Sequence, residues 1–289
     1  MLRRAKLITK KSDNSRHILA LSGGKDSAAL AVYLKDKIPD LEYVFLDTGH
    51  ELPETYEYLD RMKAILGIKI TTLRSKRDFD YWLTIFGGVL PSPQNRWCTR
   101  ELKIIPYEQY IGTDKAFSYV GLRYDEDRMG YISGKPNIIP RYPFIEDELI
   151  EEDIKTILED SGLGLPTYYK WRSRSGCYFC FFQRRTEWVA LHTYHPDLFE
   201  KACAYETNHS DGRTYTWVKG VRLQELVNKN KEINLNGTIV KKDSFKKLKD
   251  NLLSVQFDAI DFDKVSASEI QNLSWQDDEN SDGCLICTL

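Results

Sequence analysis

The sequence predicts an α/β fold, a parallel sheet with flanking helices, joined to a smaller, mainly helical C-terminal part that contains cysteines. The first half of the chain alternates short apolar runs with amphipathic stretches, which is typical of βα units. After about Pro166 the pattern changes, and aromatic, arginine and cysteine residues crowd together between Tyr168 and Phe182. We therefore expect two parts, residues 1–165 and residues 166–289, the second ending in a flexible tail.

Each predicted strand is a short apolar run, and each predicted helix has apolar residues at helical spacing. The predicted strands are His17–Leu21, Tyr43–Leu46, Lys69–Leu73 and Phe117–Leu122. The predicted helices are Ser27–Lys37, Pro53–Leu66, Ile150–Glu159, Glu187–His192 and Asp197–Tyr205. The helix that starts at Ile150 is rich in acidic residues in its first turn, where the helix dipole favours them.

The overall charge argues against a uniformly basic nucleic-acid binder, because the chain contains 41 basic and 43 acidic residues. Basic residues do cluster at Arg3–Lys11 and Lys170–Arg185, either as solvated faces or as local binding patches. No apolar run approaches the roughly 18 residues that a membrane helix needs. Met1–Arg16 also lacks the apolar stretch of a secretory signal. We therefore expect a cytoplasmic protein without a membrane partner.

The strongest motif lies between the first predicted strand and the first predicted helix. It consists of Ser22, Gly23, Gly24, Lys25, Asp26 and Ser27. Glycines let the backbone approach an anion closely, and a helix N-terminus adds positive potential. Lys25 adds a full charge, and the serines add hydroxyl donors. The residue order differs from that of a Walker A loop. The motif predicts a phosphate-binding loop rather than an ordinary βα turn.

Two further segments follow predicted strands. Asp47, Thr48 and Gly49 end the second strand, at the edge where open parallel sheets bind ligands. Asp47 could equally cap a turn. Arg123 and Arg128 follow a later strand, and their planar guanidinium groups suit contact with phosphate or a charged acceptor as well as surface ion pairs.

These motifs resemble those of the PP-loop ATP pyrophosphatases, in the phosphoadenosine-phosphosulfate reductase-like superfamily. Besides the loop, the resemblance rests on Val44–Gly49, Pro53–Thr55, Arg96–Thr99, Leu102–Lys103, Gly121–Arg123, Glu126 and Arg128. It implies an adenine nucleotide alpha-hydrolase-like fold in which Asp47, Thr48 and Gly49 line the adenosine pocket. The reductases of this superfamily have a modified loop without the lysine. Lys25 therefore favours ATP cleavage, with Lys25, Asp26, Arg123 and Arg128 as catalytic candidates.

Six cysteines in a cytoplasmic chain predict a metal, cluster or redox site rather than structural disulfides. Cys177 and Cys180 form a Cys-x-x-Cys pair, whose spacing alone fits zinc, an iron–sulfur cluster or a redox pair. Members of the superfamily with a Trp-Cys-Thr segment and a later Cys-x-x-Cys include iron–sulfur sulfurtransferases that act in DNA phosphorothioation and tRNA thiolation. The resemblance thus implies Cys98, Cys177 and Cys180 as cluster ligands. Cys203 is a candidate fourth ligand or a core thiol.

The sequence ends in a second pair, Cys284 and Cys287, after a run of acidic and polar residues. The sulfonucleotide reductases are similar in placing a nucleophilic cysteine on a C-terminal tail. We expect this pair to deliver or accept sulfur or to complete a metal site, and the alternative is that it has no role.

The combined expectation is an enzyme that adenylates an acceptor with ATP and Mg²⁺ and then transfers sulfur from a cysteine persulfide or a [4Fe-4S] cluster, with zinc as the alternative metal. The acceptor is unknown, DNA or tRNA being candidates, and a cysteine desulfurase is a candidate sulfur donor. Two alternatives stay open. One is a sulfonucleotide reductase, and the other is a non-catalytic, nucleotide-sensing or DNA-associated subunit with structural zinc.

Overall fold

One parallel sheet organises the chain. The computed structural model describes residues 15–127, 133–207 and 212–228. Within them five strands pair in the order β3-β2-β1-β4-β5, and every pairing is parallel. The strands are β1 (Arg16–Leu21), β2 (Leu41–Leu46), β3 (Ile70–Leu73), β4 (Ala116–Tyr119) and β5 (Ile138–Arg141). The predicted fold class is confirmed.

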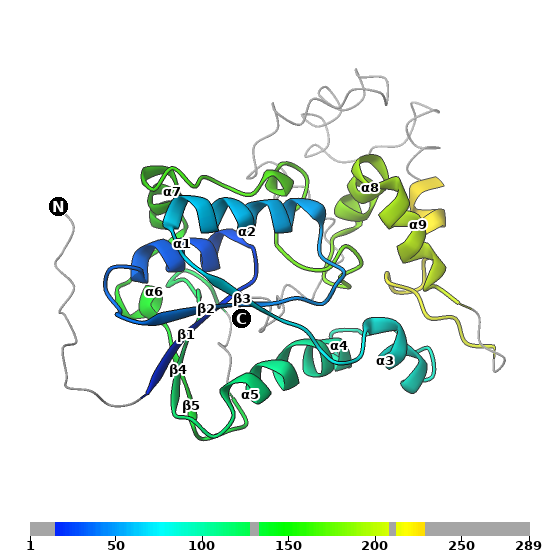
Figure 1. Cartoon of the computed structure of the whole chain (residues 1–289). Helices are drawn as coiled ribbons and strands as arrows, with labels where there is room; N and C mark the ends of the chain where they lie inside the picture. The colour runs from blue at the N-terminus through cyan, green and yellow to red at the C-terminus, as the bar shows by residue number, and fades with distance from the viewer. Residues whose placement is uncertain (1–14, 128–132, 208–211, 229–289) are drawn as a thin grey trace, which may run out of the picture.

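Helices cover both faces of the sheet (Figure 1). On one face lie α1 (Lys25–Leu34), α2 (Pro53–Leu66), α6 (Pro143–Glu146) and α7 (Glu151–Asp160), and on the other lies α5 (Ile105–Ile111). Successive side chains of a strand point to opposite faces. Leu19 and Leu21 accordingly pack against α1, whereas Ile18 and Ala20 pack on the side of α5. This two-sided burial explains why β1 is a continuous apolar run.

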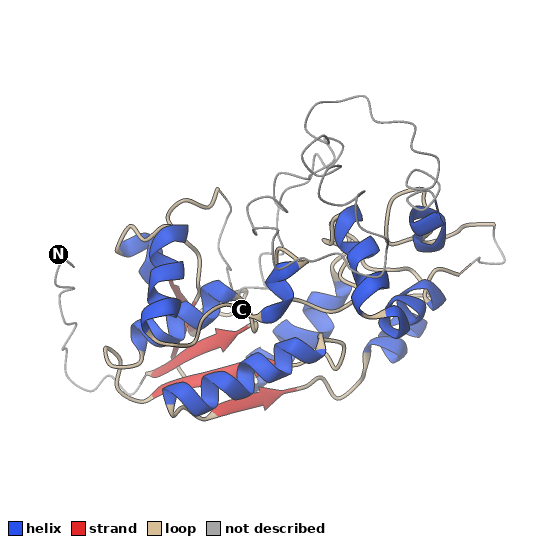
Figure 2. Cartoon of the chain, turned by 90° about the horizontal axis from the view of Figure 1, so that it is seen from above, coloured by secondary structure: helices blue, strands red, loops and turns tan. Residues whose placement is uncertain are grey.

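A second core lies beyond the carboxyl ends of the strands (Figure 2). The segment between β3 and β4 contributes α3 (Phe79–Ile85), α4 (Trp97–Thr99) and a π-helical turn, η1 (Arg100–Ile104). The C-terminal part contributes η2 (Thr167–Lys170), α8 (Arg185–Tyr194) and α9 (Pro196–Ala204). The rings of Phe79 and Phe179, one from each segment, lie 4.4 Å apart. The boundary near residue 165 stays a prediction, and this core draws on both sides of it.

The predicted strand Phe117–Leu122 ends earlier than expected, at Tyr119. Beyond it the chain turns toward the loop after β1, and a Cβ atom on Gly121 would lie 3.0 Å from the backbone of Asp26. Val120 still donates to the carbonyl of Arg141 in β5, and the N–H of Leu122 then closes a tight turn onto the carbonyl of Val120. Strand β5 was not predicted from the sequence, because a proline interrupts its four residues. No helix among the described residues has the length and apolar character to cross a membrane.

Gly121→Ala should destabilise the protein, because the new methyl group would press on backbone atoms that cannot rotate away. We expect a loss of about 1–3 kcal/mol in unfolding free energy, measured by denaturant titration. Gly134→Ala is the control, since no atom lies within 4 Å of its added methyl group. Equal stability of the two variants would contradict the close approach.

Candidate functional site

The loop of residues 22–27, here called the phosphate loop, lies where the strand order reverses. Its strand, β1, pairs with β2 on one side and with β4 on the other. The connections leaving β1 and β4 therefore diverge, and open parallel sheets bind ligands outside the carboxyl ends of their strands at such points. The structure thus places the predicted loop at the expected binding edge of the sheet.

Hydroxyl groups hold the phosphate loop in shape. Ser27 Oγ accepts from the backbone N–H of Ser22 at 3.2 Å and donates to the carbonyl of Gly24 at 3.1 Å. Ser22 Oγ lies 3.1 Å from Ser27 Oγ and accepts from the N–H of Gly24 at 3.3 Å. The two serines, expected as phosphate donors, therefore also fix the backbone of the loop.

The C-terminal part packs directly on the phosphate loop. Tyr168 donates to the carbonyl of Gly23 at 2.8 Å, and the hydroxyl of Tyr169 accepts from the N–H of Lys25 at 3.2 Å. Ser175 donates to Ser22 Oγ at 3.2 Å. Burial raises the pKa of both tyrosines, so their hydroxyl groups remain protonated. A segment some 150 residues away in sequence therefore determines the geometry of the loop.

Three of the predicted catalytic side chains meet at the start of α1. Lys25 Nζ lies 3.4 Å from Asp26 Oδ1 and 3.7 Å from Glu151 Oε1. Arg123 Nη1 lies 3.0 Å from the same Asp26 oxygen. Burial alone would lower the pKa of Arg123, but Asp26 and neighbouring carboxylates outweigh it and raise the pKa. Two cations thus stand beside the phosphate loop, held by carboxylates that a phosphate group could replace as partners.

Asp47 is buried and holds the turn that follows β2. Its Oδ1 accepts from the N–H of Gly49 at 2.7 Å and from Tyr56 at 2.8 Å. Its Oδ2 accepts from two nitrogens of Arg74 at 2.8 and 2.6 Å. Asp47 therefore acts as a turn anchor in this structure. Its contact with adenosine, and that of Thr48 and Gly49, stay predictions.

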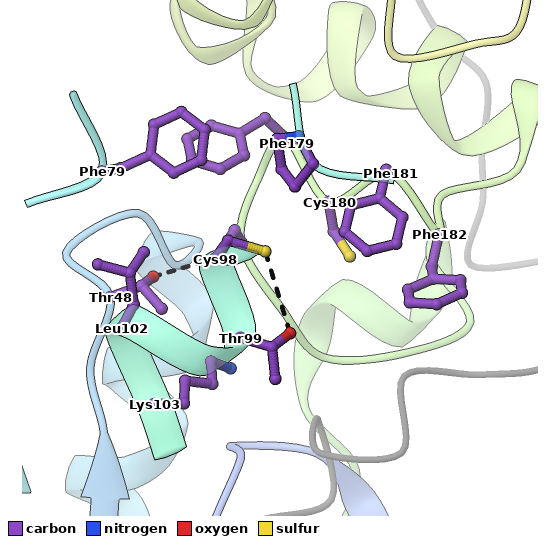
Figure 3. Close-up of a pocket in the computed structure, with 12 residues that line it drawn as sticks. Thr48, Phe79, Cys98, Thr99, Leu102, Lys103, Phe179, Cys180, Phe181 and Phe182 are labelled. Carbon is purple, nitrogen blue, oxygen red and sulfur yellow. Dashed lines mark hydrogen bonds between the residues drawn. The ribbon is translucent and has the colours of Figure 1, made fainter. Parts of the chain in front are cut away.

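The three thiols of the predicted ligand set line one pocket (Figure 3). This thiol pocket is lined by Thr48, Phe79, Pro91, Cys98, Thr99, Leu102, Lys103, Cys177, Phe179, Cys180, Phe181 and Phe182. It encloses about 450 Å³, counting the solvent at its mouth. The sulfur atoms of Cys98 and Cys180 both point into it (Figure 3). The sequence brings them together because α4 and residues 177–180 both belong to the second core.

The polar contacts of Cys177 lie on the wall of this pocket. Its sulfur is 3.1 Å from Thr48 Oγ1 and 3.8 Å from Glu51 Oε1. Burial, and then the charge of Glu51, raises the pKa of the Cys177 thiol well above its usual value. Among the described residues no three His, Cys, Asp or Glu side chains are gathered tightly enough to hold one metal ion.

The other predicted ligands and nucleophiles lie elsewhere. Cys203 is on α9 and packs in the second core, outside the thiol pocket, where burial raises the pKa of its thiol to about 11. Arg128, Cys284 and Cys287 lie outside the described residues.

Sequence reasoning missed several residues that shape the site. Tyr168, Tyr169 and Ser175 reach the phosphate loop from the C-terminal part, and no local motif marks them. Arg74 follows β3 and so meets Asp47, which ends the neighbouring strand. Glu51 lies between the two segments, Val44–Gly49 and Pro53–Thr55, that carried the family resemblance, and this position was the available signal.

One protein-family model matches the part of the chain that contains strands β1 to β4. Residues 16–131 match the model of the phosphoadenosine phosphosulfate reductase domain. The reductase-like domain includes the phosphate loop, Asp47, Cys98 and Arg123, whereas Cys177 and Cys180 lie after the matched residues.

Several curated proteins are similar in sequence. Two uncharacterised proteins of Methanocaldococcus jannaschii are 26% and 29% identical over 63% and 64% of this chain. The matches span 45% and 40% of those proteins, so the chain corresponds to less than half of their length. The adenosine 5'-phosphosulfate reductase of Streptomyces coelicolor is 26% identical over 37% of this chain and 44% of its own length.

Two solved structures are also similar. The phosphoadenylyl-sulfate reductase of Candida auris matches with a TM-score of 0.46 and 13% identity, covering 57% of this chain and 82% of its own. The U34-tRNA thiolase NcsA of Methanococcus maripaludis, solved with its [4Fe-4S] cluster, matches with a TM-score of 0.41 and 15% identity. That match covers 82% of this chain and 87% of the thiolase.

Tyr168→Phe should weaken ATP binding, because it removes the donor that holds the Gly23 carbonyl of the phosphate loop. Leaving this buried carbonyl unpaired should also cost about 1–3 kcal/mol of stability. Tyr58→Phe is a matched control, since Tyr58 donates over the same 2.8 Å to the carbonyl of Gly164. Calorimetric titration with ATP should show weaker binding for Tyr168→Phe alone. If the Tyr168→Phe and Tyr58→Phe variants bind ATP with equal affinity, the hydrogen bond to the Gly23 carbonyl does not contribute to nucleotide binding.

Proposed function

We propose that this protein cleaves ATP between its α- and β-phosphates to adenylate an acceptor, and that sulfur then replaces the adenylated oxygen. An acceptor oxygen attacks the α-phosphorus, and pyrophosphate leaves. A sulfur nucleophile next attacks the acceptor atom that bears this oxygen, carbon in a base or phosphorus in a DNA backbone, and the bond from that atom to the oxygen breaks as AMP leaves with the oxygen. The observation that carries this proposal is the 3.2 Å contact between Ser22 of the phosphate loop and Ser175, two residues before Cys177.

The first half of the reaction depends on charge at the phosphate loop. Lys25 and Arg123 stand together near the N-terminus of α1, where negative charge grows as pyrophosphate departs. Several loop amides and both serine hydroxyls bond to one another or to Tyr169, so phosphate binding would exchange some of these hydrogen bonds for bonds to phosphate, and Mg²⁺ would enter with ATP. Asp26 contacts both cations, so in this proposal it fixes their position, and a role as a Mg²⁺ ligand stays a prediction.

The second half depends on the thiol pocket. Cys98, Cys177 and Cys180 would hold an iron–sulfur cluster, because three thiols from two distant segments line one largely aromatic pocket. When bound, such a cluster would hold the sulfur that is transferred to the acceptor. In a simpler mechanism, one of these thiols would carry that sulfur as a cysteine persulfide. A cysteine desulfurase could supply the sulfur, and DNA or tRNA could be the acceptor in the cytoplasm. Cys284 and Cys287 stay candidate sulfur carriers.

A sulfonucleotide reductase is the second candidate, favoured by the match of residues 16–131 to the reductase domain. Such an enzyme would bind its nucleotide without releasing pyrophosphate from ATP. Lys25 in the loop favours ATP cleavage, so pyrophosphate release separates the two functions.

Lys25→Ala should reduce the rate of pyrophosphate release from ATP at least about 100-fold. Removing one hydrogen-bond donor that stabilises the charge of a transition state commonly has an effect of this size. The fold should stay intact. Lys155→Ala is the control, because Lys155 also pairs with Glu151, at 3.4 Å, but lies outside the phosphate loop. The measurement is a coupled pyrophosphate assay on both variants, together with their melting curves. Full turnover by a folded Lys25→Ala protein would remove this loop from the mechanism.

Cys177→Ser and Cys180→Ser should each lose bound metal, because serine is a poor substitute for a thiolate ligand. Cys203→Ser should retain it, since Cys203 lies outside the thiol pocket. The measurement is iron, sulfide and zinc content after purification without oxygen, with visible absorption. Broad absorption with iron and sulfide would support a cluster, and stoichiometric zinc would support the structural-zinc subunit. Retention of metal by both pocket variants would show that the ligand set is wrong.

A further inference from the structure

Arg172 is a fully buried cation close to the Cys-x-x-Cys pair. It lies two residues after η2, in the segment that packs on the phosphate loop, and its exposed fraction is 0%. Arginine is almost never fully buried unless it is paired, because removing a charge from water is costly. The partners of Arg172 should therefore account for its position.

The guanidinium of Arg172 donates to two successive carbonyl groups. Its Nη1 donates to the carbonyl of Gly176 at 3.1 Å, and its Nη2 donates to the carbonyl of Cys177 at 2.8 Å. The carbonyl of Cys177 also accepts from the N–H of Cys180 at 3.0 Å, which closes the turn between the two thiols. A planar guanidinium can bond to two such acceptors at once, whereas the lysine ammonium is a point charge. Arg172 thus holds the first residue of the Cys-x-x-Cys turn in place.

The guanidinium also lies close to the sulfur of Cys180. Gly176 has a φ of +140°, and a Cβ atom on it would lie 3.6 Å from Arg172 Nη2 and 3.9 Å from Cys180 Sγ. Both atoms are therefore within 4 Å of one point beside Gly176. The same sulfur points into the thiol pocket (Figure 3). The positive charge of Arg172 thus stands directly behind the thiols of the turn.

No carboxylate of the described residues forms an ion pair with Arg172, and its buried Nε has no hydrogen-bond partner among them. Glu54 is influenced by Arg172 through space, but Glu54 Oε1 bonds to His195 Nε2 at 2.8 Å. Burial raises the pKa of Glu54, whereas the hydrogen bond with His195 and the charge of Arg172 lower it overall. Two carbonyl groups therefore stabilise the charge of Arg172 without neutralising it.

We propose that Arg172 is a positioning residue of the thiol pocket, which holds the Cys-x-x-Cys turn and supplies a positive charge that balances its thiolates when they bind a metal centre. This inference rests on the proposed function, which assigns that centre to Cys98, Cys177 and Cys180. Cysteines bind metal as thiolates, so ligation brings negative charge into the pocket. A nearby cation stabilises such charge, and most strongly when the centre has gained an electron.

The test uses the full chain, reconstituted with ferrous iron and sulfide without oxygen. Arg172→Gln removes the charge but keeps an amide donor, and Arg172→Lys keeps the charge but lacks the planar fork. The midpoint reduction potential should become more negative in Arg172→Gln, because the added electron loses a nearby cation. In Arg172→Lys it should stay close to that of the unsubstituted protein. Both variants should lose iron to a chelator at least about 10-fold faster, because the turn is held less firmly.

Arg61→Gln is the matched control. Arg61 also donates to a backbone carbonyl, that of Leu165, at 2.9 Å, and its buried Nε likewise has no partner in the described part of the chain. It bonds to no residue of the Cys-x-x-Cys turn, so its replacement should leave the potential and the retention of iron unchanged.

A merely structural role would lower the melting temperatures of both Arg172 variants without moving the reduction potential of Arg172→Gln, and that result would overturn the role of the charge. Iron retention in Arg172→Lys equal to that of the unsubstituted protein would overturn the positioning role, and this variant decides the matter if Arg172→Gln does not fold. Both results would leave the proposed function standing. Failure of the unsubstituted protein to take up iron would instead overturn the cluster, and this inference with it.

Discussion

The packing of residues 168–177 against the phosphate loop joins the two halves of this molecule. Tyr168 and Ser175 reach the loop through hydrogen bonds of 2.8 and 3.2 Å, and Gly24 has no room for a side chain because a Cβ atom would lie 2.7 Å from Ser175 Oγ. The segment that forms this contact continues directly into Cys177. The phosphate loop at the edge of the sheet and the thiol pocket in the second core are thereby joined by one short segment.

Buried charge is concentrated along the same contact. Lys25, Asp26 and Arg123 form an ion-pair network beside the phosphate loop, and Glu51 and Lys103 form a looser pair behind Cys177. Buried ion pairs contribute little net stability, because desolvation offsets their attraction. Stability alone therefore does not explain their placement, and perturbed charged groups of this kind are typical of functional sites.

The sequence predicted four of the five strands and the turn of residues 22–27 because each depends on a local signal, whereas the grouping of Cys98 with Cys177 and Cys180 came from the family resemblance. An apolar run followed by Ser22–Ser27 identifies a strand, a turn and a helix N-terminus. The contacts of Tyr168, Arg74 and Glu51 depend instead on which strands are neighbours and on how the second core closes over the sheet. Strand β5 was missed because its short, proline-containing segment pairs only along one edge, with β4. Such features follow from tertiary packing, which no single segment specifies.

The end of β2 explains how one short segment can serve both sites. Asp47 holds the turn through Gly49 and Arg74, on the side of the predicted adenosine pocket, whereas its neighbour Thr48 lines the thiol pocket. Thr48 in turn contacts both Glu51 and Cys177, at 3.1 Å each. Asp47 and Thr48 are consecutive residues, so the turn on one side and the hydroxyl that contacts the thiol and the carboxylate on the other share one short stretch of backbone. The proposed nucleotide and sulfur sites would therefore meet at this strand end rather than lie in separate parts of the fold.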